Sequence, residues 1–311
     1  MATPDITAGA RPAPRLRASR RRYGEDVVKG LLALCALVSV ATTVGIVVAL
    51  FLPAIEFFRT ISIVDYLTGI RWAPLFEPAS FGVVPLILGT LSVTLWALLM
   101  CIPFGLGASI YLSEYAGSRM RKILKPALEV LAGVPTVVYG FFALTFVTPL
   151  LRDLGLGLEV QNALAAGLVM GVMLIPTVAS ISEDAMSAVP RDLRDGAYAL
   201  GSTRFQVATR IVVPAAASGI VASFVLAISR AVGETMIVLL AAGQKPTLTF
   251  DPRDAIETMT AFIAATGQGD IPIDSIEYKT IFAVGATLFV ATLVMNLFSI
   301  RLVRKFREVY E

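Results

Sequence analysis

The chain has 311 residues, of which 56% are hydrophobic and 16% charged, with a formal net charge of +3, whereas about 25% of the residues in a soluble domain are charged. This composition excludes an ordinary soluble domain and predicts an integral membrane protein. The apolar residues gather into charge-free runs, and roughly 20 such residues carry a helix across the bilayer. Histidine is absent, and Cys35 and Cys101 lie within apolar runs, so we expect no disulfide, no metal site and no cofactor.

The first feature along the chain is a cluster of arginines, Arg11, Arg15, Arg17, Arg20, Arg21 and Arg22. Because Lys and Arg accumulate on the cytoplasmic side of a first transmembrane helix, residues 1–26 are predicted to be a basic cytoplasmic tail and not a nucleic-acid-binding arm. The apolar stretch 31–55 is longer than the apolar core of a secretory signal. We therefore expect it to be retained.

Residues 27–311 are predicted to form one all-α domain with six transmembrane helices. The expected spans are 27–51, a stretch within 81–112, 126–151, 160–182, 211–242 and 280–301. Tyr66 and Trp72, in the loop after the first span, suit a membrane interface. Gly167 and Gly171 in the fourth span form a G-x-x-x-G face suited to close helix packing.

Proline and glycine in the third and fourth spans carry further expectations. We expect Pro135, Pro176 and Gly140 to bend or pack their helices. Thr136 and Tyr139 are candidates to line a path, although such residues at helical spacing are more often packing elements.

The orientation follows from the distribution of Lys and Arg. The N-terminal tail, the link after the second span, the segment 183–210 and the C-terminal tail are rich in them, whereas the opposite links hold only Arg59, Arg71, Arg152, Lys245, Arg253 and Lys279. Both termini are therefore predicted to be cytoplasmic.

The segment 183–210, between the fourth and fifth spans, is polar and amphipathic. Leu193, Ala197 and Leu200 recur at helical spacing, so a short helix is expected to present one apolar face to a partner. Gly201 then supplies a turn. Pro214 is expected in the first turn of the fifth span, where the two helices meet at a defined corner. The alternative is an amphipathic helix that rests on the lipid surface.

Arg230 and Glu234 are the main candidates for a substrate pathway. They are expected near the middle of the fifth span, one helical turn apart, where they can face the same side. Charges within a membrane are costly and mark solute pathways. The alternatives are a pair that locks the fifth span against its neighbours, or an arginine that reaches the interface. Glu129 is a weaker candidate, expected to be a solvated charge near Lys125.

A motif in the segment 183–210 resembles a known family. Asp195, Gly196 and Ala197, then Gly201, then Ile211, Val213 and Pro214 match the spacing of the EAA-x3-G-x9-I-x-L-P signature of bacterial ABC importer permeases. Asp-Gly replaces Glu-Ala at its start, and Val replaces Leu before the proline. The resemblance implies the MetI-like fold of type I ABC importer permeases, in which this segment is a coupling helix that docks onto a nucleotide-binding subunit.

Longer stretches resemble the PstC-type permease of the phosphate importer. They are YLTGIRWAPLFEPASFGVVPLILGTL, LEVLAGVPTVVYGF and SRAVGETM, and the PstA-type permease shares parts of them. The resemblance implies that Arg230 and Glu234 are needed for transport. It also implies four kinds of partner: a second, PstA-like permease, two copies of a PstB-like ATPase, a PstS-like extracytoplasmic phosphate-binding protein, and phosphate itself.

The expected function is thus that of a permease subunit in a bacterial inner membrane, without an ATPase site of its own. The chain contains no G-x-x-x-x-G-K-[ST] loop to hold nucleotide phosphates. Three alternatives stay open: a permease for sulfate, molybdate or phosphonate, a secondary transporter with ion-coupling carboxylates and internal repeats, and a membrane enzyme.

Overall fold

The computed structural model describes residues 23–305, and the side chains of residues 24–301. The arginine cluster of the predicted N-terminal tail lies outside the described residues. The chain divides into two compact units, residues 1–49 and 50–311. The described part of the first unit is helical and belongs to α1, which continues through Pro53 to Thr60.

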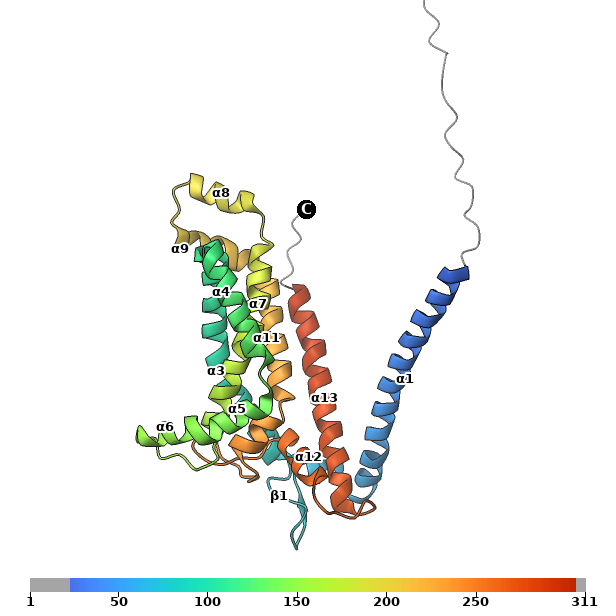
Figure 1. Cartoon of the computed structure of the whole chain (residues 1–311). Helices are drawn as coiled ribbons and strands as arrows, with labels where there is room; N and C mark the ends of the chain where they lie inside the picture. The colour runs from blue at the N-terminus through green and yellow to red at the C-terminus, as the bar shows by residue number, and fades with distance from the viewer. Residues whose placement is uncertain (1–22, 306–311) are drawn as a thin grey trace, which may run out of the picture. The chain divides into compact units, whose positions relative to one another are not determined.

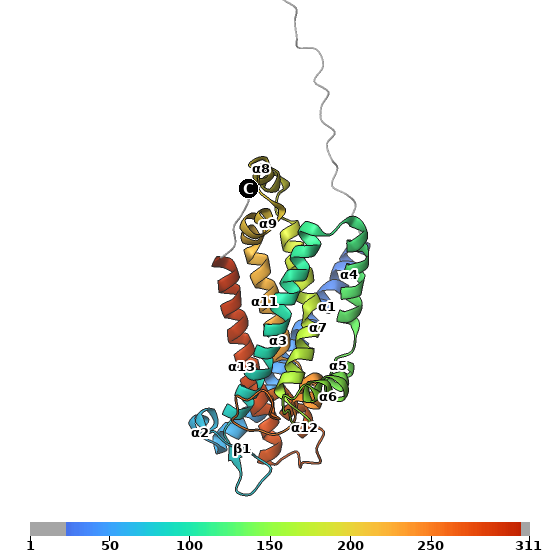
Figure 2. The ribbon, with the colours of Figure 1, turned by 90° about the vertical axis from the view of Figure 1, so that its left-hand side faces the viewer.

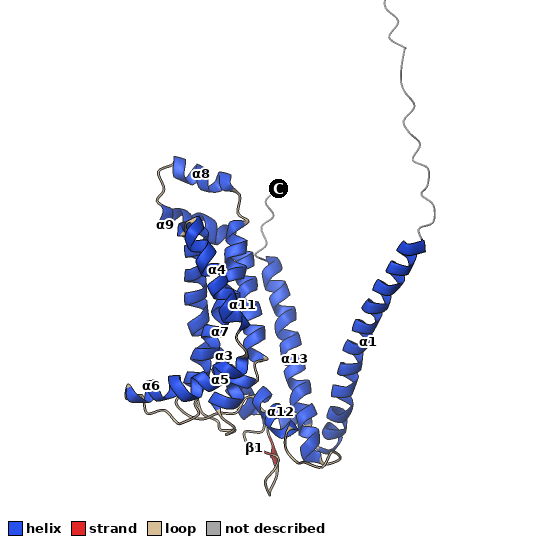
Figure 3. Ribbon diagram, viewed as in Figure 1, coloured by secondary structure: helices blue, strands red, loops and turns tan. Residues whose placement is uncertain are grey.

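The described elements are almost all helical (Figure 3). In chain order they are α1 (Tyr23–Thr60), α2 (Ile63–Thr68), β1 (Trp72–Ala73), β2 (Ser80–Phe81), α3 (Val84–Ile110), η1 (Tyr111–Tyr115), α4 (Ser118–Gly133), α5 (Thr136–Phe142), η2 (Ala143–Val147), α6 (Thr148–Asp153), α7 (Ala163–Ser187), α8 (Arg191–Ala199), α9 (Arg204–Val207), η3 (Ala208–Val212), α10 (Val213–Ala215), α11 (Ala217–Val232), η4 (Val238–Ala242), α12 (Met259–Gly267) and α13 (Ile276–Lys305). The four η elements are single π-helical turns within or beside longer helices.

Four helices within residues 23–305 are long and apolar enough to cross a membrane, and the number reaches six when each of two bent helix pairs is taken as one span. The four are Gly24–Thr60, Val84–Tyr115, Ala163–Ser187 and Ile276–Arg301. The bent pairs are Ser118–Gly133 with Thr136–Asp153, and Arg204–Ala215 with Ala217–Val232. The all-helical architecture predicted from the sequence is therefore confirmed.

The centre of the second unit is the contact between α3 and α7. A Cβ atom added at Gly167 would lie 2.5 Å from the Cβ of Trp96, and one at Gly171 would lie 2.5 Å from the Cβ of Met100. Only glycine permits that approach, because real Cβ atoms do not come so close. The predicted G-x-x-x-G packing face is confirmed, and α11 packs on the same helix α7.

The third predicted span is broken. It begins earlier than expected, at Ser118, and the helix axis turns by 88° between α4 and the α5–α6 segment. Pro135 lies at the break, where Val134 has an extended ψ of 130°. Proline disfavours the helical region for the residue before it. The span predicted over 126–151 is therefore a bent helix pair, and the bend expected at Pro135 is confirmed.

The two ends of the second unit differ in structure (Figures 1 and 2). α8 and α9 lie at one end, called here the α8 end. The β1–β2 hairpin, α2 and α12 lie at the other, called here the hairpin end.

The hairpin end has a small aromatic core of its own. Tyr66 and Trp72 are fully buried there, and the Trp72 ring meets the Phe262 ring edge to face at 4.9 Å between centroids. Both rings pack inside the protein, Tyr66 against Phe57 and Trp72 against Tyr66 and Phe262, and their place at a membrane interface stays a prediction. This core fixes α12 relative to α3.

Candidate functional site

The segment 183–210 folds into two short helices joined by a tight turn at the α8 end. Its first residues complete α7, which ends at Ser187. The chain reverses after α8 at Gly201, whose φ of 81° lies in the left-handed region that side chains disfavour. A capping box then starts α9: the backbone N–H of Gln206 donates to Thr203 Oγ1, and the backbone N–H of Thr203 donates to Gln206 Oε1. Local sequence therefore determines this turn.

The short helix predicted in this segment is present as α8, and its apolar residues differ in exposure. Ala197 is half-buried and packs on a cluster formed by Met186, Val189, Val207, Val212, Ala216 and Ile220. Leu193 is exposed, and Leu200, which directly follows α8, is 88% exposed. Tyr198 and Phe205 are exposed as well. That the apolar side chains meet a partner stays a prediction.

The residues of the coupling motif are divided between the outer side of α8 and the corner that follows it. Asp195 and Gly196 lie exposed on α8. Pro214 lies in α10, directly before a bend of 72° between Arg204–Ala215 and Ala217–Val232. The corner expected at Pro214 is present, so α8 is linked to the apolar helix α11 through a fixed angle.

An arginine that the sequence analysis did not single out holds α8 in place. The Arg194 guanidinium donates to the carbonyl oxygens of Val189 at 2.6 Å and Met186 at 2.7 Å, both near the end of α7. It also pairs with Glu114 at the end of α3, with 3.1 Å between Nη2 and Oε1. The Arg194 and Glu114 side chains are only 16% and 5% exposed. Arg194 thus joins α8 to two of the long apolar helices.

A second buried ion cluster ties α4 to α7. Glu183 is buried, and its carboxylate forms ion pairs with the partly exposed Arg121, at 3.2 Å, and Lys125, at 2.5 Å. Lys125 and Glu183 border a cavity of about 410 Å³ that Glu129 also lines. Glu129 is exposed, as expected, but Lys125 pairs with Glu183 and Asp184 instead.

The structure separates Arg230 from Glu234. α11 ends at Val232, so the two residues do not lie one turn apart on a continuous helix. Glu234 is buried, and its Oε1 accepts from the backbone N–H groups of Met236 at 3.1 Å and Ile237 at 3.4 Å. Glu234 thus caps the helical turn that follows it, because its carboxylate satisfies backbone N–H groups that have no partner within the helix.

Arg230, by contrast, is exposed at the end of α11. It makes no ion pair with any residue of the described part of the chain within 4 Å. The expected Arg230–Glu234 pair is therefore absent from the described structure. The reason is local: the free N–H groups of the next helical turn occupy the carboxylate.

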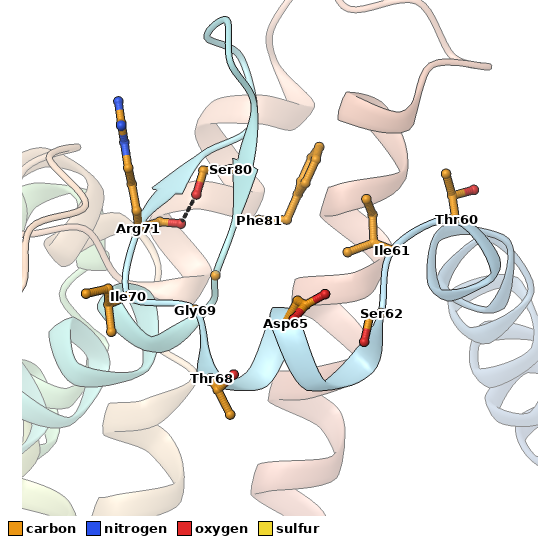
Figure 4. Close-up of a pocket in the computed structure, with 11 residues that line it drawn as sticks. Thr60, Ile61, Ser62, Asp65, Thr68, Gly69, Ile70, Arg71, Ser80 and Phe81 are labelled. Carbon is orange, nitrogen blue, oxygen red and sulfur yellow. Dashed lines mark hydrogen bonds between the residues drawn. The ribbon is translucent and has the colours of Figure 1, made fainter.

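An open cavity of about 550 Å³ lies at the hairpin end, between the end of α1, α2 and the hairpin (Figure 4). Its charged residues are Asp65 and Arg71, and Arg71 extends away from Asp65. Ser80 Oγ donates to the Arg71 carbonyl oxygen at 2.7 Å. No group of three Cys, Asp or Glu residues within 23–305 is arranged to hold a metal ion.

Comparison with known proteins identifies relatives over most of the chain. Residues 102–308 match the family model of the binding-protein-dependent transport system inner membrane component. A probable ABC transporter permease protein, YqgH of Bacillus subtilis, is 35% identical and covers 93% of this chain and 94% of its own length. The phosphate transport system permease protein PstC of Haemophilus influenzae is 30% identical over 91% of this chain and 94% of its own. PstC 1 of Mycobacterium tuberculosis is 35% identical over 73% of each.

Solved structures share the fold. A bacterial alginate ABC transporter in complex with an alginate pentasaccharide-bound periplasmic protein matches 94% of this chain and 100% of its own, with a TM-score of 0.65 and 17% identity. The MetNI methionine ABC transporter matches 73% of this chain and 95% of its own, with a TM-score of 0.56 and 16% identity. At these identities the likeness concerns the fold alone.

Proposed function

The chain belongs to the binding-protein-dependent transport inner membrane components, the permease subunits of ABC importers, and we propose that the solute it conducts is phosphate. The proposal is supported by similarity to PstC phosphate permeases at 30–35% identity. Its PstC-like stretches extend from the hairpin end to the end of α11.

The single observation that carries the coupling role is the attachment of α8. A helix that transmits force from an ATPase needs a free outer surface and a stiff connection to the transmembrane helices. α8 offers Leu193, Asp195, Gly196 and Leu200 outward, while Arg194 is bound on its inner side to α3 and α7. We propose that this outer surface docks on a separate nucleotide-binding subunit, present in two copies in the importer.

Arg230 is proposed to contact phosphate during transport. Its guanidinium group is exposed and unpaired within the described residues, and a planar fork of donors suits a phosphate oxygen pair. Glu234 is proposed to act differently: it holds the break between α11 and the following turn, so that Arg230 stands at the end of a helix. The second permease subunit supplies the other half of the path.

The family description makes the chain an inner membrane component. We propose that the α8 end and both termini face the cytoplasm, which agrees with the Lys and Arg distribution. The hairpin end then faces the extracytoplasmic binding subunit that delivers phosphate.

Reconstituted transport tests the proposal. The chain is co-expressed with its candidate partners, purified as a complex and placed in liposomes, and uptake of labelled phosphate is measured with and without ATP and the binding subunit. We expect uptake that requires both, and that excess unlabelled phosphate suppresses while sulfate, molybdate and phosphonate do not. Uptake suppressed by one of these other oxyanions, or uptake by the chain alone, would contradict the proposal.

A further inference from the structure

A cavity of about 310 Å³ lies at the hairpin end, between the hairpin, the loop after η4 and α12. Its wall is mostly apolar, and the residues that matter are Trp72, Phe76, Gln244, Glu257, Phe262 and Thr266. At about 30 Å³ per water molecule, the volume equals roughly ten waters. That is room for one long side chain.

Glu257 is the only ionisable side chain that lines this cavity. It is 6% exposed, and within residues 24–301 no ion pair and no hydrogen bond joins its carboxyl group to another residue. A charge buried without a partner is unfavourable, and burial accordingly raises the pKa of Glu257 to about 7. Four charged residues adjoin the lining residues in sequence, the acids Glu77 and Asp270 and the bases Arg71 and Lys245, and none of them lines the cavity.

The backbone holds Glu257 at this position. A Cβ atom at Gly89 of α3 would lie 2.2 Å from the Glu257 carbonyl oxygen, so the two backbones are in direct contact. On either side, the Ile256 N–H donates to the Ala242 carbonyl oxygen at 2.9 Å and the Met259 N–H donates to Thr90 Oγ1 at 3.0 Å. The carboxyl group is therefore presented to the cavity by a fixed peptide, which lowers the entropic penalty of binding.

Trp72 adds a second unsatisfied group. Its indole is 2% exposed, and Nε1 has no acceptor among the residues that the structure describes. The ring is fixed by its edge-to-face contact with Phe262. A buried N–H without an acceptor is unfavourable, but Nε1 itself has almost no accessible surface, so Trp72 contributes its ring to the wall and Glu257 is the polar group that an occupant can meet.

These groups select the charge and shape of an occupant. A cation next to Glu257 restores the favoured ionised form of the carboxyl, whereas an anion would be repelled by it. The apolar wall suits the hydrocarbon stem of a lysine or arginine, whose head reaches the carboxylate.

We propose that this cavity receives one lysine or arginine side chain of the extracytoplasmic binding subunit, paired with Glu257. The inference rests on the proposed function, which places the hairpin end toward that subunit. The exposed acids Glu77 and Asp270 are balanced by the exposed bases Arg71 and Lys245, which also adjoin the lining residues in sequence, so Glu257 inside the cavity is the group that selects a cation. Exposed Phe76 and Leu75 supply apolar contact area beside it.

The pairing links docking to pH, with a definite sign. Docking of a cation favours the ionised carboxylate, so below pH about 7 one proton must leave Glu257 before docking. The dissociation constant of the binding subunit is then expected to rise up to about tenfold per pH unit as the pH falls below that value. Above it, the constant is expected to be flat. An anionic occupant would reverse the sign.

The test measures docking of the purified binding subunit, without nucleotide, on the assembled importer in lipid nanodiscs, one pH unit above and below the Glu257 pKa of about 7. For Glu257→Gln we expect binding at the higher pH to weaken by about thirtyfold or more, and the pH dependence attributable to the importer to disappear. Trp72→Phe is expected to weaken binding less and to keep the pH dependence. Glu77→Gln is the matched control: it removes an exposed acid of the same hairpin and keeps the slope.

Two results would overturn the inference: docking of Glu257→Gln with unchanged affinity and slope, or docking of the unaltered importer that strengthens as the pH falls. Thermal unfolding checks that each variant is folded. Phosphate uptake by the unaltered importer, measured on the same preparation, separates the two proposals. If phosphate uptake is present while the affinity of docking does not depend on Glu257, the proposed role of the cavity is wrong and the phosphate function stands.

Discussion

Replacement of Arg194 by alanine is expected to detach α8 from the transmembrane helices. The change leaves the Glu114 carboxylate, 5% exposed, without its partner, and loss of one partner of a buried ion pair costs about 3–5 kcal/mol. The hydrogen bonds to the Met186 and Val189 carbonyl oxygens are lost as well, at about 1 kcal/mol each. These energies are local, so they weaken the attachment of α8 more than the packing of α3 on α7.

The assay compares ATP hydrolysis with phosphate uptake in the same proteoliposomes. Because a loosened α8 transmits less force, we expect Arg194→Ala to lower uptake at least about tenfold, and stimulation of hydrolysis by the loaded binding subunit to be lost. Arg191→Ala is the matched control. Arg191 is exposed on the same helix and makes no ion pair within the described residues, so uptake and stimulation should stay near the unaltered values.

A double replacement separates charge from mechanics. In Arg194→Met with Glu114→Leu, no buried charge is left unpaired, and apolar replacement of a buried pair is often close to neutral. We expect the double variant to be more stable than Arg194→Ala and to recover part of the coupling. Arg194→Ala with unaltered uptake and unaltered stimulation would refute the role given to this contact.

Four other residues give predictions of their own. Gly167→Leu should lower stability by about 1–3 kcal/mol, because its side chain has no room against α3; thermal unfolding in detergent checks this, with Gly107→Ala, which faces open space, as the near-neutral control. Arg230→Gln should reduce phosphate uptake at least about tenfold in a complex that still assembles. Glu234→Ala should lower the unfolding temperature, because it removes a helix cap that contributes about 0.5–2 kcal/mol. Glu234→Gln should retain the cap and the unfolding temperature. Gly201→Ala should cost about 1–2 kcal/mol through backbone strain alone, seen as faster hydrogen exchange confined to α8 and α9.

The sequence predicted the helices better than their breaks. Apolar runs and the spacing of Gly167 and Gly171 depend on residues close in the chain, and both predictions were confirmed. The break at Pro135 was signalled only by the proline, because composition does not distinguish one span from two shorter helices at 88°. The same limit applies to α11, whose end at Val232 lies inside a run that reads as one apolar helix.

The candidate site was predicted in part. Gly201 and Pro214 carry their signals in their own backbone preferences, and the structure has the expected turn and corner. The partners of Arg194 carried no such signal, because Glu114 lies 80 residues away. The only hint in the sequence was Glu114 itself, an acid at the end of a long apolar run without an adjacent basic residue.

The sequence by itself determined three things: that the chain crosses a membrane, which glycines allow two helices to pack closely, and which segment resembles a coupling helix. Each depends on hydropathy, glycine spacing or proline geometry, which are local properties. Only the tertiary structure decided which charges meet. Glu234 accepts hydrogen bonds from the backbone N–H groups of the following helical turn and does not pair with Arg230. Arg194 pairs with Glu114, whereas Glu257 has no partner among the described residues. Ion pairs in a buried environment depend on distances of a few ångströms between separate helices, and those distances are set by packing and not by order along the chain.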